Sequence, residues 1–81
     1  MDKLFFVYYV NLPVELEKMI LSDRHVTLLK EGVKEFKGGR FARVVIRVRA
    51  SSNAEDKARS KKVEDLLYSL KVTGQIVEYV V

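Results

Sequence analysis

The segment from Phe41 to Ala50 alternates strictly between two sets of side chains. One set is apolar and consists of Ala42, Val44, Ile46 and Val48, and the other is largely basic and consists of Phe41, Arg43, Val45, Arg47 and Arg49. Successive side chains of a β-strand point to opposite faces of a sheet. The pattern therefore predicts a half-buried strand with a basic outer face.

A second strand is predicted over residues 4–11, which are rich in aromatic and β-branched residues. Both of its faces are apolar, with Phe5, Val7 and Tyr9 on one and Leu4, Phe6, Tyr8 and Val10 on the other. Such a strand should lie centrally in a sheet and be covered on both sides. We expect one of these covers to come from outside the chain's own helices.

Two helices are predicted from their starting residues. Asn11 can cap the first helix, which has Pro13 in its first turn and a buried stripe of Leu16, Met19 and Ile20. Ser52 and Glu55 have the spacing of a capping box, and they predict a second helix over about residues 53–70. Its packing residues are expected to be Ala54, Ala58, Val63, Leu66, Leu67 and Leu70.

Three segments allow two interpretations. Residues 25–36 fit a helical period, but Gly32 and the β-branched residues favour a strand. Residues 37–40, Lys-Gly-Gly-Arg, suit either a hairpin turn or a helix C-cap. Thr73 and Gly74 should end the second helix, after which residues 75–81 have strand composition, although a helix that continues to the end also fits.

The order of elements predicts a single α+β domain over residues 1–81, built as strand, helix, hairpin, helix and a final strand. We expect a two-layer sandwich with an antiparallel sheet and both helices on one face, in a ferredoxin-like or closely related arrangement. A chain of 81 residues has a small core, and without cysteine it has no disulfide to support it. Dimerisation is the expected source of additional stability.

Reaction chemistry has little support in the sequence. His25 is the only imidazole and is expected to be a surface or capping residue. The acidic pairs Glu15 with Glu17 and Glu55 with Asp56 fall in first helical turns, where the helix dipole favours acids without any metal. We therefore predict no catalytic residue, no metal site and no cofactor.

No apolar run is long enough for a membrane span and no signal peptide is apparent, so a cytoplasmic protein without a membrane partner is expected. The high content of charged residues, 32%, favours a thermophilic source.

Positive charge is concentrated in residues 37–62, which hold nine bases and two acids. Arginines beside aromatic rings suit single-stranded RNA, and residues 7–12 resemble the first signature of RNA-recognition motifs. The second signature fails over residues 37–42, because Gly39 stands where an aromatic is expected. The candidate nucleic-acid contacts are Tyr8, Arg40, Phe41, Arg43, Arg47, Arg49, Lys61 and Lys62.

The same strand faces also suit a protein interface, in which Phe6, Tyr8 and Phe41 form a dimer surface that the arginines surround. The C-terminal residues are more apolar than a free end requires and are expected to dock on a larger partner. The candidate partner contacts are Phe6, Tyr8, Val10, Ile76, Val77, Tyr79 and Val80.

The element order and residues 41–81 resemble the small dimerisation subunit of the KEOPS complex, which makes threonylcarbamoyladenosine in tRNA. The matching residues are Val48-Arg49-Ala50, Ala58-Arg59-Ser60, Val63 with Leu67, Lys71, and Ile76-Val77-Glu78. The chain differs in having Glu64-Asp65 where the family has a polar Asn-Ser pair, about three extra residues between Ala50 and Val63, and a short first helix. These differences suggest a divergent paralogue.

The resemblance implies a non-catalytic accessory subunit. Such a subunit would pair with itself or a paralogous small subunit, dock on the larger catalytic subunit through its last helix, and support tRNA binding. The alternative is a stand-alone RNA- or nucleic-acid-binding module with an RNA-recognition-like sheet.

Overall fold

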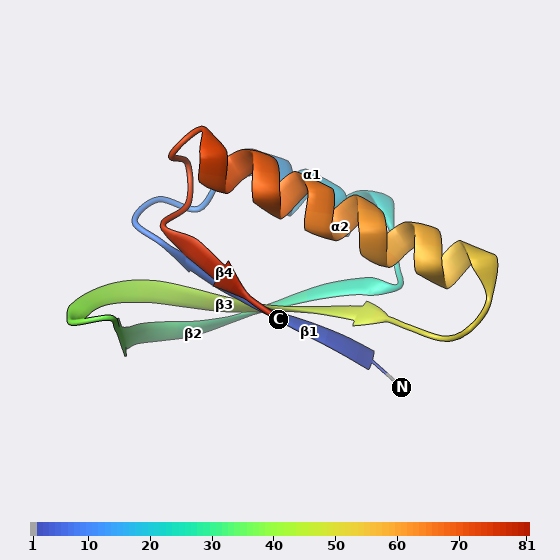
Figure 1. The fold of residues 1–81 in the computed structure, drawn as a ribbon, viewed down its shortest axis with the longest axis horizontal. Helices are drawn as coiled ribbons and strands as arrows, with labels where there is room; N and C mark the ends of the chain where they lie inside the picture. Colours follow the sequence, from blue (N-terminus) through green and yellow to red (C-terminus); the bar gives the residue numbers. More distant parts are fainter. Residues whose placement is uncertain (1) are drawn as a thin grey trace.

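The computed structural model describes residues 2–81, which form four strands and two helices. In chain order the elements are β1 (Asp2–Tyr9), α1 (Val14–Ser22), β2 (Val26–Phe36), β3 (Gly39–Arg49), α2 (Ala54–Val72) and β4 (Glu78–Val80). The strands form one sheet in the order β2-β3-β1-β4, with antiparallel pairing throughout. Both helices lie over the same face of this sheet (Figure 1). The predicted α+β class with an antiparallel sheet and two helices is confirmed.

The core lies between the helices and the inner face of the sheet. The alternation in β3 is confirmed, because Val44, Ile46 and Val48 are completely buried. From β1, Phe5 and Val7 are also completely buried, as the two central strands require. The helices complete the core with Leu16, Val63, Leu67 and Leu70. Ala54 and Ala58, which were expected to pack, are exposed because they lie on the opposite side of α2 from its buried residues, Asp56, Val63, Leu67 and Leu70.

Both helix starts differ from the prediction by one or two residues. The N-cap of α1 is Pro13, and no side chain caps it, so the capping role expected for Asn11 is wrong. At α2 the cap is Asn53, whose side-chain oxygen accepts a hydrogen bond from the backbone N–H of Asp56 at 3.0 Å. The capping box of Ser52 and Glu55 is therefore also wrong. The same three-residue spacing recurs one position later with a stronger capping residue.

Residues 25–36 contain the strand β2, and a bulge in it explains the misleading helical period. Its pairing with β3 shifts register between Lys30 and Val33, where Gly32 has a φ of 77°. Before the bulge Val26 and Leu28 face the core, whereas beyond it the alternation changes phase. Apolar residues on both sides of the bulge then have nearly helical spacing although the backbone is extended.

The C-terminal residues form the edge strand β4, so the helical alternative for residues 75–81 is wrong. Gly74, with a φ of 76°, ends α2, and Leu70 O then accepts a hydrogen bond from the N–H of Gln75 at 2.8 Å. Ile76 is only 4% exposed and belongs to the core. This segment is therefore an integral part of the fold. Within residues 2–81, neither helix has the length and apolar character needed to cross a membrane.

Candidate interaction surface on the open sheet face

The open face is the face of the sheet that points away from the helices (Figure 1). It carries one of the two apolar sets predicted for β1 and the basic set predicted for β3. Its centre is an apolar row that crosses all four strands, because each residue is the register partner of the next. The row consists of Leu29 on β2, Val45 on β3, Phe6 on β1 and Val80 on β4. Leu29 is 65% exposed and Val80 is 42% exposed. We call these four residues the apolar row.

Arg43 lies beside the apolar row and is held by its own chain. Its Nε donates to Glu31 Oε1 at 2.7 Å, and its Nη1 lies 3.4 Å from the Tyr8 hydroxyl. The guanidinium carbon is 5.1 Å from the centroid of the Phe6 ring, which is a cation–π distance. The Tyr8 and Glu31 contacts raise the pKa of Arg43 above its ordinary value. Arg43 is therefore already paired and desolvated within the chain.

Tyr8 is similarly occupied. Its ring stacks on Phe36 with 4.1 Å between centroids, and the residue is only 7% exposed. A base that stacked on Tyr8 would first have to displace Phe36. The pair joins β1 to the end of β2 across β3, a contact between strands that are not neighbours in the sheet.

Gly39 leaves room for the Phe41 ring in the position that it occupies. A Cβ at position 39 would come within 2.7 Å of the Phe41 ring, because both residues lie on the open face of β3. The structure thus gives a physical reason for the glycine that breaks the second RNA-recognition signature. Phe41 itself is half-buried.

The other predicted arginines occupy different surroundings. Arg47 is exposed and lies 3.7 Å from the carboxylate of Asp2, a weak surface pair. Arg49 is exposed at the end of β3. Arg40 lies near the β2–β3 turn, on the opposite side of β3 from Phe41 and Arg43. Arg43, Arg47 and Arg49 therefore share the open face, as the alternation of β3 predicts, whereas Arg40 does not.

Lys61 and Lys62 lie on α2, on the side of the sheet opposite to the open face. Lys61 pairs with Asp65 at 3.1 Å, with both side chains mostly exposed. Lys62 borders a groove of about 330 Å³ between α1 and α2, whose apolar lining comes from Met19 and Leu66. These two lysines and the strand arginines are separate surfaces.

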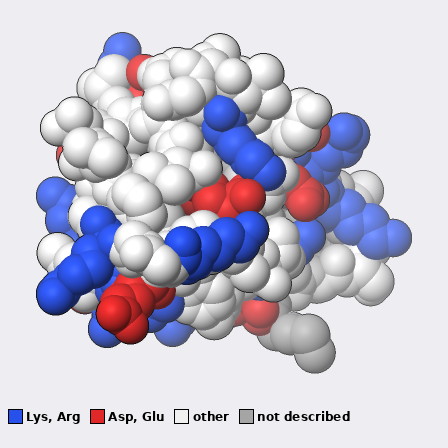
Figure 2. Space-filling model, turned by 60° about the vertical axis from the view of Figure 1, so that its left-hand side comes forward, with Lys and Arg blue, Asp and Glu red and all other residues white. Residues whose placement is uncertain are grey.

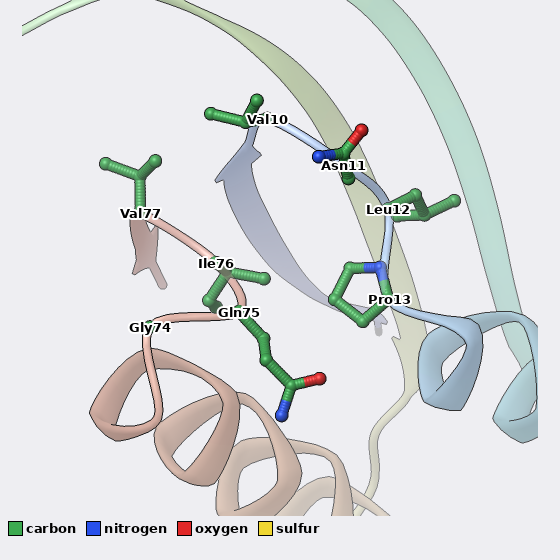
Figure 3. A pocket seen from close by; sticks show the side chains of 8 residues that line it. All are labelled: Val10, Asn11, Leu12, Pro13, Gly74, Gln75, Ile76 and Val77. Carbon is green, nitrogen blue, oxygen red and sulfur yellow. The ribbon is translucent and has the colours of Figure 1, made fainter.

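The candidate partner contacts also lie in different parts of the fold. Phe6, Tyr8 and Val80 belong to the open face, whereas Ile76 and Tyr79 pack toward the core. Val10 and Val77 border a hollow of about 320 Å³ at one end of the sheet (Figure 3). It lies between the β1–α1 and α2–β4 connections and is lined by Val10, Asn11, Leu12, Pro13, Gly74, Gln75, Ile76 and Val77.

A buried ionic cluster was missed by the sequence reasoning. Arg59, with a side chain 13% exposed, donates from Nε to Asp23 Oδ2 at 2.8 Å and pairs through Nη1 with Asp56. Asp56 is itself 7% exposed and accepts a hydrogen bond from the Ser51 hydroxyl at 2.7 Å. Glu55 lies four residues before Arg59 and has the helical spacing of an ion pair, but the partners of Arg59 are Asp23 and Asp56. The cluster ties the start of α2 to the connection between α1 and β2.

The pKa values of the cluster follow from these contacts. The backbone N–H of His25 and the Arg59 guanidinium lower the pKa of Asp23, and the Ser51 hydroxyl and Arg59 lower the pKa of Asp56. The two carboxylates raise the pKa of Arg59 in turn. All three groups are charged at neutral pH and satisfy one another, which is the arrangement of a structural cluster.

Metal-binding chemistry has no support in the part of the chain that the structure describes. Across residues 2–81, no three His, Asp or Glu side chains come together closely enough to hold an ion.

Compared with protein-family models, with curated proteins and with solved structures, the chain shows no significant match to any of them.

Proposed function

We propose that the protein is a non-catalytic, dimerising accessory subunit of a tRNA-modifying assembly of the KEOPS kind. In this proposal it pairs with a second copy of itself, or with a like subunit, through the open sheet face. The observation that carries the proposal is the apolar row, Leu29, Val45, Phe6 and Val80, which crosses all four strands on the face without helices. The assembly and its tRNA come from the family resemblance, and a cytoplasmic location remains part of the proposal.

The energetics favour covering this face. Fully burying one large aliphatic side chain stabilises a protein by roughly 1.5–3 kcal/mol. Phe6 and Val45 are already half-buried in the single chain, so most of the gain would come from covering Leu29 and Val80 in both copies. In a chain of 81 residues, whose stability is small, even this contribution is significant. A symmetric interface also brings the same row into contact with itself, which needs no second type of surface.

The state of Arg43 and Tyr8 favours a protein partner over stacked bases at this face. Glu31 neutralises Arg43, whose guanidinium already lies against the Phe6 ring. Tyr8 already has a stacking partner in Phe36. An ion pair that is satisfied within the chain can be covered by an apolar partner without leaving an unpaired charge.

Within the α+β class, we propose a specific arrangement of strands and helices. The strand order β2-β3-β1-β4, with one helix between β1 and β2 and another between β3 and β4, supports a ferredoxin-like arrangement. In such a sandwich one sheet face is covered by helices and the other is available for pairing.

A matched pair of variants tests the pairing. Leu29 and Leu21 are both largely exposed, at 65% and 88%, but Leu29 lies on the open face and Leu21 on α1. Leu29→Glu would bury a carboxylate in the proposed interface, so light scattering at micromolar concentration should give a monomer. Leu21→Glu adds the same charge to the other layer and should remain a dimer.

Three outcomes would contradict parts of the proposal. A monomeric wild-type chain that also fails to associate with a co-purified like subunit removes the pairing. A dimer that survives Leu29→Glu and dissociates with Leu21→Glu moves the interface to the helices. If deleting the gene leaves the threonylcarbamoyladenosine content of tRNA unchanged, the assembly is wrong and only the pairing remains.

A further inference from the structure

The β2–β3 hairpin extends past the helix layer as a twisted two-stranded ribbon (Figure 1). We define the hairpin arm as residues 30–43. The side chains that β2 contributes to the core precede it, at Val26 and Leu28, and residues 32–35 are all exposed. Ala42, at the base of the arm, packs against the core and pairs with β1, and the fold projects the rest of the ribbon beyond it.

The arm is ordered to its tip by local contacts. Phe36 pairs with Gly39 in the strand register, so only Lys37 and Gly38 form the turn. Both have positive φ, 48° and 80°, as in the tight turn that matches the twist of a β-hairpin. The Tyr8–Phe36 stack fastens the arm to β1. A charged group on the arm is therefore held in a defined position.

The arm is basic, with five bases and two acids, so it carries +3 of the chain's formal +4. Glu31 is already paired with Arg43, which leaves Glu35 as the other acid. The remaining bases are Lys30, Lys34, Lys37 and Arg40. Among residues 2–81 none of these four has a carboxylate within 4.0 Å.

These bases surround the ribbon. Lys34 is the register partner of Phe41 and lies on the open side, whereas Arg40, one residue earlier on β3, lies on the helix side. Lys37 lies at the tip, close enough to Glu78 to lower the pKa of that carboxyl, although Lys71 has the larger effect on it. Figure 2, which turns the hairpin end forward, shows basic side chains gathered at its lower left with an acidic group among them.

We propose that the hairpin arm binds the phosphate backbone of a nucleic acid. A two-stranded ribbon fits the major groove of a B-form duplex, where cations on both of its faces meet the phosphates on both walls. The major groove of an RNA duplex is deep and narrow, so against RNA the same cations would contact backbone phosphates from outside that groove. The occupant is a nucleic acid because the charges are dispersed around a narrow projection with few apolar groups between them. The inference deepens the RNA association within the proposed function and rests on it, but it uses a different surface from the pairing face.

The test compares two triple variants that lose the same charge. The arm variant is Lys34→Ala, Lys37→Ala and Arg40→Ala, and the control is Lys18→Ala, Arg24→Ala and Lys57→Ala, which removes bases outside the arm that are not candidate nucleic-acid contacts. All six side chains are exposed, so both variants should fold, which circular dichroism verifies. Binding is measured by fluorescence anisotropy with a tRNA transcript, a 20-base-pair RNA duplex, the matching DNA duplex and a single-stranded oligonucleotide, each over a series of salt concentrations.

The arm variant should reduce the slope of log affinity against log salt by about 2 to 3, because each lost phosphate contact contributes about 0.7–0.9. The control should keep the slope of the wild type. Equal reductions in both variants, or no binding of any probe by the wild type at low salt, would overturn the proposal. The probe that binds tightest identifies the form of nucleic acid.

Light scattering of the arm variant separates this proposal from the pairing. A dimer that has lost nucleic-acid binding supports the arm, and a loss of binding that occurs only with loss of the dimer overturns it. Failure of Leu29→Glu to dissociate the dimer, with the salt slope of the arm intact, would count against the pairing face alone.

Discussion

Arg59 shows how much one side chain contributes when it joins separate parts of a small fold. It connects Asp23, which follows α1, with Asp56 in the first turn of α2. Arg59 and Asp56 are largely buried, while the side chain of Asp23 is 31% exposed, so removing the arginine leaves the Asp56 charge buried without its ionic partner. In a domain of this size such a loss is a large share of the total stability.

Arg59→Met should therefore lower the free energy of unfolding by about 2–3 kcal/mol at pH 7, measured by urea denaturation. The matched control is Glu55→Gln, which removes an exposed acid from the same helical turn and should change stability by less than about 0.5 kcal/mol. A value for Arg59→Met within that small range would show that the cluster contributes nothing.

The same variant has a pH dependence of known sign. The pKa values of Asp23 and Asp56 are lowered in the folded chain, so the stabilisation is complete above the unfolded value of about 3.9. It is lost as the pH falls through the lowered folded values. The difference between wild type and Arg59→Met should thus shrink below about pH 4.

The cluster also marks the limit of what spacing predicts at this scale. Glu55 has the ideal separation from Arg59 on a helix, but Asp56 and Asp23 hold the guanidinium. The position of Asp23 depends on how the α1–β2 connection packs against α2, and this is a long-range property. Local spacing finds candidate partners but does not rank them against partners from other elements.

At the scale of elements, strands with one buried face were easier to predict than ends and bulges. The strict alternation of β3 survives in the structure because its core side is fully buried, so a slip of one residue would turn every side chain to the wrong face. Apart from Gly32, the sequence of β2 has no comparable pattern that would predict the bulge. The predicted cap of α2 was one residue off because several residues near Asn53 can cap a helix, and packing selects among them.

The hairpin turn illustrates a conflict between stability and surface charge. Lys37 has a φ of 48°, which non-glycine residues adopt at a cost of about 1 kcal/mol. Lys37→Asn would create the Asn-Gly pair that this turn type prefers. It should raise the stability by about 0.5–1 kcal/mol in urea denaturation and lower the salt slope of nucleic-acid binding by about 1.

The control for this substitution is Lys57→Asn, in the helical part of the chain. It removes one charge without relieving any backbone strain, so it should give no gain in stability and leave the salt slope unchanged. If Lys37→Asn proves less stable than the wild type, the lysine at the tip contributes more to the fold than the strain in its backbone costs.

At the scale of the whole molecule, the two layers have separate roles. The helices cover one face of the sheet and close the core, while the other face keeps an apolar row exposed. The hairpin arm extends the sheet past the helix layer. Sequence reasoning predicted an apolar face of β1 that the chain's own helices do not cover, with Arg43, Arg47 and Arg49 on one side of β3, but it did not predict that Glu31 pairs with Arg43. Alternation predicts on which side of a strand each side chain lies, but it does not predict which cations already pair with an acid in the same chain.

The pairing makes a quantitative prediction about thermal unfolding. For a dimer that unfolds to two chains, a tenfold rise in concentration stabilises the folded state by about 1.4 kcal/mol per dimer, or about 0.7 per chain. A domain of this size shifts its Tm by roughly 4–8 °C per kcal/mol, so the expected rise is about 3–5 °C for each tenfold step. Leu29→Glu should show no such dependence, and Leu21→Glu should keep it. Scanning calorimetry between about 5 and 500 μM measures the effect. A Tm that is independent of concentration in the wild type would mean that the apolar row of a single chain stays in water, and the proposed pairing would fail.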